Sequence, residues 1–200
     1  MHPYATDSSE TKAVPLYIAA LGVVAAYLLH VTLEKTKFTI PWWIDAPSVV
    51  GFYGLFYAVF NTWLWRSSWV RKIRLVKIPD LHGIWKGDLI TSFDEHSGKH
   101  NAELQISQTW TRISINLKTD SSQSHSLIGG IITQNYSATV LDYECSNEPR
   151  SHAKATMHAH RGTARLVLNK NNDLWILEGD YYSGRDRQNY GTIRVEKATN

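Results

Sequence analysis

The sequence WLWRSSWVRKIRLVK, residues 63–77, marks an abrupt change of composition in this chain of 200 residues. It combines three tryptophans with five basic residues, and no acidic residue follows before Asp80. Long apolar runs precede it, whereas the sequence that follows is polar and alternating. A basic cluster next to an apolar run is typical of the cytoplasmic flank of a membrane span. The stretch therefore divides the chain into a membrane part and a second, polar part.

The polar part carries almost no net charge. From Asp80 onward 14 acidic residues stand against 13 Lys and Arg, so the formal charge of +3 comes from the basic cluster. Binding to DNA or RNA needs many basic residues on the globular domain, because affinity for a phosphate backbone comes from counterion release. We therefore expect no nucleic-acid partner. Cys145 is the only cysteine, which excludes an intrachain disulfide and favours a small, partly buried thiol.

Two charge-free apolar runs, 14–31 and 48–65, predict transmembrane helices. Each has 18 residues, which at ~1.5 Å per residue approaches the ~30 Å thickness of a bilayer core. Tryptophans near the ends of the second run are typical of an aromatic belt. The connecting loop is nearly balanced in charge, so the positive-inside rule places both termini in the cytoplasm. The sequence predicts a two-helix transmembrane hairpin with a cytoplasmic C-terminal domain.

Small residues recur at four-residue spacing in both runs, as Gly22 with Ala26 and Gly54 with Ala58. This spacing lets helix backbones approach closely inside a membrane. Two interpretations stay open: the two helices pack against each other, or neighbouring copies of the chain pack together.

Short alternating runs after Gly83 predict eight β-strands and no helix. A meander of eight strands removes its edges only by closing, so we expect an antiparallel up-and-down barrel of the calycin or lipocalin type. Gly83-Ile84-Trp85 resembles the calycin Gly-x-Trp pattern, which predicts that Arg194 covers Trp85. Gly162 suggests a β-bulge. The expected strands are 83–91, 101–107, 111–119, 126–133, 137–144, 156–168, 174–182 and 190–196.

Alternate loops of such a meander share one end of the barrel, here the loops near 93–100, 118–123, 146–152 and 183–189. The planar guanidinium of arginine matches the geometry of phosphate oxygens, and aromatic rings stack on bases. This end of the barrel therefore suits a small nucleotide. On the strand 174–182 we expect the face containing Trp175, Leu177, Gly179 and Tyr181 to point inward. Polar and basic residues collect at this end: Lys118, Ser124, Asn147, Arg150, His152, Tyr182, Arg185 and Arg187.

Known catalytic motifs are absent from the sequence, and we expect no enzyme activity and no cofactor. His158 and His160 have a spacing that holds metals in some proteins, but no third ligand is identifiable, so ordinary rim histidines are the better interpretation.

The order of parts and several local patterns resemble the two-transmembrane, β-strand-rich effectors of bacterial CBASS antiphage systems. The patterns are GIWKG (83–87), LQISQ (104–108), LDYECSNEPR (141–150), HRGTARL (160–166) and LEGDYYSGRDRQNYGTI (177–193). The resemblance implies a cyclic-dinucleotide sensor that a partner nucleotidyltransferase activates during phage infection. It further implies oligomerisation, disruption of the bacterial inner membrane and abortive infection. The alternative is a membrane-tethered calycin-like carrier of a lipid or other apolar molecule.

Six residues are the candidate ligand-binding set: Tyr143, Asn147, Arg150, Tyr182, Arg185 and Arg187. The predicted parts are an N-terminal cytoplasmic segment (1–13), the helical hairpin (14–70), a basic juxtamembrane linker (71–80) and the ligand-sensing barrel (81–200).

Overall fold

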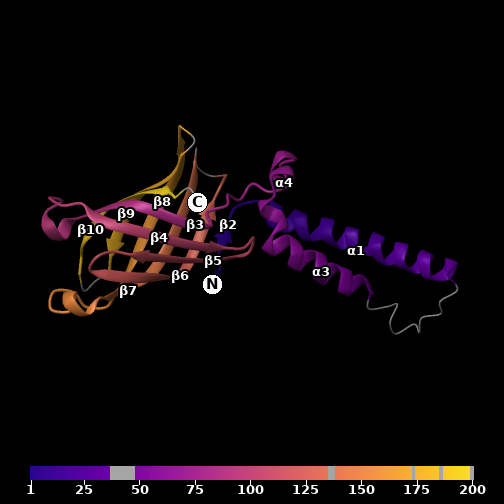
Figure 1. Cartoon of the computed structure of the whole chain (residues 1–200), viewed down its shortest axis with the longest axis horizontal. Coiled ribbons are helices and arrows are strands. Elements are labelled where there is room, and N and C mark those ends of the chain that lie inside the picture. Colours follow the sequence, from indigo (N-terminus) through magenta and orange to yellow (C-terminus); the bar gives the residue numbers. More distant parts are fainter. Residues whose placement is uncertain (37–47, 135–137, 173, 185–186, 199–200) are drawn as a thin grey trace. The chain divides into compact units, whose positions relative to one another are not determined.

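The computed structural model describes residues 1–36, 48–134, 138–172, 174–184 and 187–198 (Figure 1). Two compact units make up the chain. One contains Met1–Ser8 together with Ile78–Asn200, and the other contains Ser9–Lys77.

The first unit is a closed β-barrel of eight long strands in a continuous antiparallel ladder (Figure 1). The ladder begins at β3, ends at β10, and closes because β10 pairs with β3. All eight expected strands are present. The strands are β3 Gly83–Thr91, β4 His100–Gln108, β5 Arg112–Lys118, β6 Ser122–Ile132, β7 Thr139–Pro149, β8 His160–Asn171, β9 Leu174–Ser183 and β10 Tyr190–Lys197. The assignment of the barrel to the calycin type stays a prediction.

Side chains that alternate along each strand fill the half of the barrel where the chain enters, which we call the closed end. Trp85 is 1% exposed, and its indole Nε1 donates to the Leu81 carbonyl at 2.9 Å. The buried Gln108 carboxamide accepts from the Leu81 N–H at 2.8 Å and donates to the Pro79 carbonyl at 3.1 Å. These bonds satisfy the backbone of the entering segment, so it serves as the floor of the barrel.

Two expectations for inward-facing residues need correction. Lys197, not Arg194, covers Trp85, since the Lys197 Nζ lies 5.5 Å from the centre of the indole ring. Arg194 points outward and forms an ion pair with Glu178 at 2.8 Å. Trp175 is 42% exposed at the start of β9, and the Lys170 Nζ on the neighbouring strand lies 5.8 Å from the centre of its ring, so it does not belong to the buried inward face.

Residues Met1–Ser8 complete the barrel wall where β5 and β6 separate. β5 and β6 pair directly only between 116–118 and 123–125, next to their connecting turn. Farther along, β1 (His2–Pro3) pairs antiparallel with β5, and β2 (Ala5–Thr6) pairs parallel with β6. Residues 1–8 show no strand pattern in the sequence, because two-residue strands are too short for alternation to appear.

Side-chain contacts fasten this N-terminal segment. The His2 Nε2 lies 2.8 Å from the Ser126 hydroxyl oxygen. The Asp7 carboxylate accepts from the N–H and the hydroxyl of Thr133 at 2.7 and 3.0 Å, and from the Gln134 N–H at 2.8 Å. Charge-assisted bonds of this kind are stronger than neutral ones.

The β-bulge expected at Gly162 is absent, because β7 and β8 pair without interruption through this residue. The irregularity lies instead between Ser126 and Ile128 on β6. A Cβ at Gly162 would lie 2.8 Å from the Tyr182 carbonyl oxygen on the neighbouring strand. Glycine at this position therefore allows the backbones of β8 and β9 to lie close together.

The second unit contains two apolar helices, α1 (Glu10–Lys35) and α3 (Ser48–Thr62). Val14, Ile18, Gly22 and Ala26 form the buried face of α1. A Cβ on Gly22 would lie 3.3 Å from the Tyr53 backbone nitrogen, so this glycine allows the two helices to pack closely.

Of the described helices, α1 alone is long and apolar enough to cross a membrane. α3 has 15 residues, about 22 Å at ~1.5 Å per residue, and ends at Thr62 rather than continuing to Trp65. Most of the expected connecting loop, 37–47, lies outside the described residues.

The basic stretch after α3 folds around a tryptophan. Short helices η1 (Leu64–Arg66) and α4 (Ser68–Lys72) follow one another, and Trp65 in the first of them is fully buried. The guanidinium carbons of Arg66 and Arg71 lie 5.3 and 5.9 Å from the centre of its ring. Cation–π contacts of this kind hold positive charge against an apolar surface.

Candidate functional site

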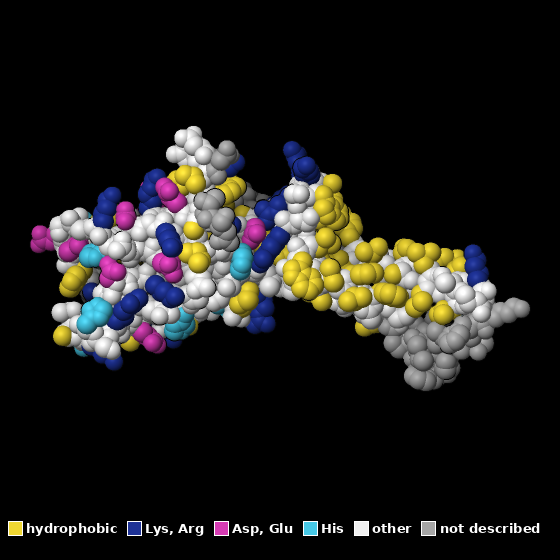
Figure 2. All heavy atoms as spheres, viewed as in Figure 1, with side chains coloured by type: hydrophobic (Ala, Val, Ile, Leu, Met, Phe, Trp, Pro, Cys, Tyr) yellow, Lys and Arg dark blue, Asp and Glu magenta, His cyan; other side chains and the backbone are white. Residues whose placement is uncertain are grey.

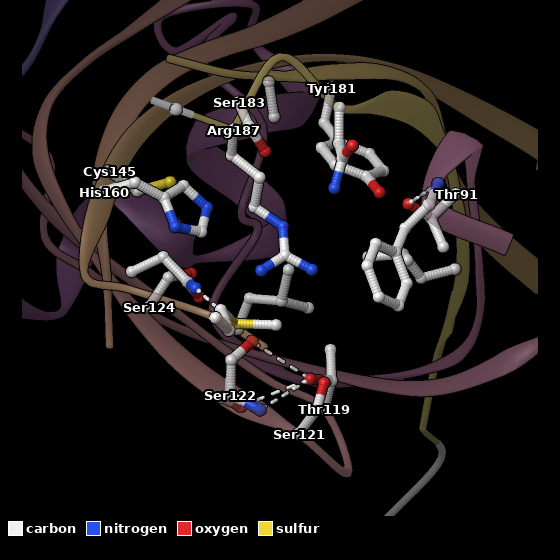
Figure 3. Close-up of a pocket in the computed structure, with 18 of the residues that line it drawn as sticks. Thr91, Thr119, Ser121, Ser122, Ser124, Cys145, His160, Tyr181, Ser183 and Arg187 are labelled. Carbon is white, nitrogen blue, oxygen red and sulfur yellow. Dashed lines mark hydrogen bonds between the residues drawn. The ribbon is translucent and has the colours of Figure 1, made fainter. Parts of the chain in front are cut away.

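The barrel encloses a cavity of about 260 Å³ in the half opposite the floor, which we call the open end. Its wall includes residues from the turns β3–β4, β5–β6, β7–β8 and β9–β10, so the four loops expected to share one end do so. This position follows from the meander, because alternate hairpins meet at the same rim. Figure 3 shows that polar side chains from several strands point into the space.

Arg187 reaches into the cavity from the β9–β10 connection, and its guanidinium lies near the centre of the space in Figure 3. Its guanidinium carbon lies 4.9 Å from the centre of the Phe93 ring, and its Nη1 donates to the Thr156 carbonyl at 3.4 Å. Burial lowers the pKa of Arg187, and the nearby Tyr181 offsets part of this shift. Within the described residues no carboxylate lies within ion-pair distance of this guanidinium.

Few charged side chains line the cavity around Arg187. Of the described residues that line the cavity, Arg187 alone carries a permanent positive charge, and Asp120 is the one carboxylate, exposed at the rim. Partial desolvation of a cation without a paired anion is unfavourable, so the cavity favours a ligand that supplies negative charge.

Hydroxyl groups form the wall at the β5–β6 turn. Thr119 and Ser122 hydroxyls lie 3.1 Å apart, and the Thr119 hydroxyl also accepts from the Ser122 N–H at 3.0 Å. Ser122 and Ser124 are 8% and 4% exposed, although both line the cavity. Small hydroxyl side chains leave room for a ligand and offer donors and acceptors to it.

Tyr181 is the aromatic residue that β9 directs into the cavity, as its alternation predicts (Figure 3). Burial raises the pKa of its phenol, and a hydrogen bond to Thr91 opposes that shift. Gly191 lies beside it on β10, where a Cβ would overlap the Ile90 carbonyl oxygen and lie 2.8 Å from the Tyr181 ring. Glycine at this position therefore leaves room for both the β3 backbone and the Tyr181 ring.

Tyr143 and Cys145 lie deeper on β7. Burial raises the pKa of both side chains, so the phenol and the thiol stay protonated at neutral pH. A hydrogen bond with Ser124 partly opposes the shift in the pKa of the Cys145 thiol. Neither group has the environment of an activated nucleophile.

The structure places the candidate binding residues differently. Tyr143, Asn147 and Arg187 line the cavity with Tyr182, but the Tyr182 side chain is 57% exposed and alternates with the inward Tyr181. Arg150 is exposed and absent from the described lining. Arg185 lies outside the described residues. Lys118 and His152, also placed at this end, do not line the cavity.

Several lining residues were missing from the candidate set, although the sequence held a signal for them. Inward positions on most strands change from large apolar residues to small or polar ones toward the open end, with Leu117 on β5 and Ile193 on β10 as exceptions. Following this gradient identifies the additional lining residues Thr91, His100, Thr119, Ser122, Cys145, His160, Tyr181 and Ser183.

The described residues contain no cluster of three metal-ligating side chains, so His158 and His160 remain a pair. The His160 Nδ1 lies 2.8 Å from the His158 carbonyl oxygen, and the ring lines the cavity. The arrangement offers one cation, aromatic faces and many hydrogen-bonding groups. Such a cavity can bind a compact anionic ligand with ring systems.

Comparisons with known proteins agree with this chemistry. The family model described as Cap15, cyclic dinucleotide receptor domain, matches residues 76–197, and the model described as Cap15, TM helices, matches residues 12–66. CD-NTase-associated protein 15 from Yersinia aleksiciae is 33% identical over 150 residues, which cover 75% of this chain and 69% of that protein. The protein of the same name from Staphylococcus schleiferi is 26% identical over 175 residues, covering 87% and 90%. The chain therefore belongs to the Cap15 family of CBASS effectors, with a receptor domain for cyclic dinucleotides and a membrane-associated helical part.

Proposed function

We propose that this chain is an antiphage effector that binds a cyclic dinucleotide in the open end of the barrel, oligomerises and disrupts the bacterial inner membrane. The signal comes from a cognate CD-NTase, and the chain itself performs no catalysis. The barrel and both termini lie in the cytoplasm, where such a messenger is made.

The observation that carries this proposal is the position of Arg187. The guanidinium is partly desolvated in the cavity, packs on Phe93 and donates to the Thr156 carbonyl. In the amide orientation that satisfies both groups, the Asn189 carboxamide oxygen also accepts from the Arg187 Nε at 2.7 Å. The Thr156 carbonyl and the Asn189 carboxamide are both neutral, so neither compensates the positive charge of Arg187.

A phosphate supplies the missing negative charge and accepts charge-assisted N–H bonds from the guanidinium. A cyclic dinucleotide brings two phosphates and two bases, which match the cation, the hydroxyl wall and Tyr181. The ligand class of the family and the chemistry of the cavity therefore agree.

The N-terminal segment supports a hairpin of two spans. Met1–Ser8 pairs with barrel strands, and Ile78–Asn200 forms the rest of the same barrel. Two parts of one folded barrel lie on one side of a membrane, so the helices between them cross an even number of times. The basic cluster after α3 then favours the cytoplasmic side for both parts.

The exposed face of α3 supports contact between copies. A Cβ added at Gly51 or Gly54 would meet no atom within 4 Å, and Ala58 lies on the same helix. Gly22 packs against α3 of the same chain, so the small residues of α1 belong to the contact between the two helices. The small residues Gly54 and Ala58 of α3 are exposed and are available to a second copy of the chain. Ligand binding drives assembly only if the assembled form binds the ligand more tightly.

A carrier of an apolar molecule is the second candidate, since Leu89, Leu117 and Ile193 line part of the cavity. An apolar ligand leaves the Arg187 guanidinium without an anion, and burying a charge in this way is unfavourable. The cavity therefore favours the cyclic dinucleotide.

Binding by the full chain in detergent tests the proposal, with isothermal titration of a panel of cyclic dinucleotides. Arg187→Gln removes the charge-assisted bonds, each contributing about 1.5–3 kcal/mol, so Kd should rise about 10- to 100-fold. Arg161→Gln is the matched control, because Arg161 lies at the same end of the barrel with its side chain 75% exposed and paired to Glu144. It should bind as the wild type does.

The same proteins reconstituted in vesicles then test the effector step. The bound ligand should cause dye leakage with the wild type and Arg161→Gln, and a larger assembly in sedimentation. Absence of binding by every cyclic dinucleotide, or equal binding by Arg187→Gln, would falsify the proposal.

A further inference from the structure

Three polar side chains stand in a row on one wall of the cavity. Ser124 on β6 is the register partner of Asn147 on β7, and Asn147 is the register partner of His160 on β8. All three line the cavity. Direct partners in antiparallel strands have Cβ atoms about 4.5–5.5 Å apart, so neighbouring members of the row can bind one ligand group. Figure 3 shows His160 and Ser124 on the wall beside the Arg187 guanidinium.

The Asn147 carboxamide offers an acceptor. Its Nδ2 donates to the Met157 sulfur at 3.5 Å, and a thioether is a weak acceptor. Within the described residues its Oδ1 has no hydrogen bond, so this oxygen is available to a ligand N–H. The Nδ2 can exchange its weak bond to sulfur for a stronger one to an oxygen.

His160 offers a second acceptor beside it. The His160 Nδ1 lies 2.8 Å from the His158 carbonyl oxygen, which can only accept, so Nδ1 carries the proton. In the neutral imidazole the Nε2 is then an acceptor. The row therefore presents two adjacent acceptors, Asn147 Oδ1 and His160 Nε2, and one exchangeable donor, Asn147 Nδ2.

Resting on the function proposed above, we propose that Asn147 and His160 recognise a guanine base of the cyclic dinucleotide. The Watson–Crick edge of guanine carries two adjacent donors, N1–H and the 2-amino group, beside the O6 acceptor. The edges of adenine, cytosine and uracil each lack two adjacent donors. Asn147 accepts from N1–H and donates to O6, and His160 accepts from the 2-amino group. A phosphate on Arg187 places the attached nucleoside next to this wall.

Replacing guanine by hypoxanthine tests this assignment, because hypoxanthine lacks only the 2-amino group. The full chain in detergent is titrated with cyclic di-GMP and cyclic GMP–AMP, in both 3′,3′ and 2′,3′ linkages, and with their hypoxanthine counterparts. The wild type should bind a guanine ligand about tenfold more tightly than its hypoxanthine counterpart, as one lost hydrogen bond to a buried group predicts. His160→Ala should abolish this tenfold difference and leave hypoxanthine ligands bound as before.

Asn147→Ala should behave differently, because guanine and hypoxanthine share N1–H and O6. It should weaken both kinds of ligand by a similar factor. His158→Ala is the matched control: it lies two residues from His160, lies outside the described lining and keeps the backbone carbonyl that orients the His160 ring. It should bind every ligand as the wild type does.

Two results overturn the assignment and leave the proposed function in place. If ligands without guanine bind as tightly, and Arg187→Gln still weakens them, the cavity is a nucleotide site but the row does not recognise guanine. If His160→Ala retains the tenfold difference, the 2-amino group has another partner and the assignment is wrong. If no cyclic dinucleotide binds at all, the proposed function fails and this inference fails with it.

Discussion

The two ends of the barrel are built by the same strands but have different interiors. At the closed end Trp85, Leu166 and Leu177 are almost completely buried and fill the space. At the open end the same alternating positions hold smaller or polar side chains such as Ser124 and Ser183, and a cavity of about 260 Å³ remains. Burial of large apolar side chains stabilises the first end, whereas the second gives up that packing for hydrogen-bonding groups. Stability and recognition are thus separated along each strand.

Figure 2 shows a related contrast between the outer surfaces of the two units. Acidic, basic and histidine side chains are scattered over the barrel, whereas hydrophobic side chains cover much of the visible face of the helices. An exposed apolar surface of this extent is typical of a protein part that contacts lipid or another chain.

Truncation at the closed end should have the largest effect. Trp85→Ala removes a fully packed indole and its bond to Leu81, so the free energy of unfolding should fall by about 3–5 kcal/mol. Urea denaturation of the full chain in detergent measures this loss. Ser183→Ala at the open end should change it by less than about 0.5 kcal/mol, and an equal loss in both variants would remove the distinction between the two ends.

Releasing the N-terminal segment should have the next largest effect. Asp7→Ala removes three hydrogen bonds to Thr133 and Gln134, so the free energy of unfolding should fall by about 1.5–3 kcal/mol. Urea denaturation of the full chain in detergent measures this loss. Asp180→Ala, on the outward side of β9, is the control and should leave the free energy of unfolding nearly unchanged. A neutral Asp7→Ala would mean that the segment does not stabilise the barrel.

Removing the cation of the open end should affect binding but hardly affect stability. Arg187→Ala relieves a partly desolvated charge, so the free energy of unfolding without ligand should change by about 0.5 kcal/mol or less. Cyclic dinucleotide should raise the melting temperature of the wild type and not that of the variant. A large loss of stability without ligand would assign Arg187 a structural role.

The reactivity of the single thiol, Cys145, tests how deeply the cavity wall is buried and should give the smallest of these effects. Burial raises the pKa of Cys145, so the folded chain should react with iodoacetamide far more slowly than the denatured chain at pH 8. Because the unfolded thiol ionises first, the stability that Cys145 contributes should be constant below the unfolded pKa and be lost as the pH rises through the folded pKa. Cys145→Ser should remove this contribution. Equal reaction rates in the folded and denatured chains would contradict the burial.

Much of the fold follows from local patterns. The eight strands and their closure were predictable because period-2 alternation and short polar turns recur after Gly83. The first helix was predictable from its apolar length, and the length of the second was overestimated, since composition alone does not show that the helix ends at Thr62.

The site was predictable in part. The meander predicted that four loops share one end, and four of the candidate residues, Tyr143, Asn147, Tyr182 and Arg187, line the cavity at that end. Tyr182 was chosen for its place at the rim, whereas alternation along β9 directs Tyr181 inward, as expected, and both residues line the cavity. Arg150 was chosen for its charge, but it follows the last residue of β7, is exposed and does not belong to the described lining of the cavity.

The N-terminal strands were not predictable, since their partners lie more than 100 residues away: His2 pairs with Ile113. Short segments of this kind fold by tertiary pairing, and local propensity gives no sign of them.

The seam between β5 and β6 also fixes an order of events during synthesis. Residues Met1–Ser8 are synthesised before β5 and β6, so they find these partners only after β6 has been made. The helices α1 and α3, which lie between them and β5, are therefore also made before the wall is finished. The wall of the ligand-receptor domain is therefore completed only after both helices have been synthesised.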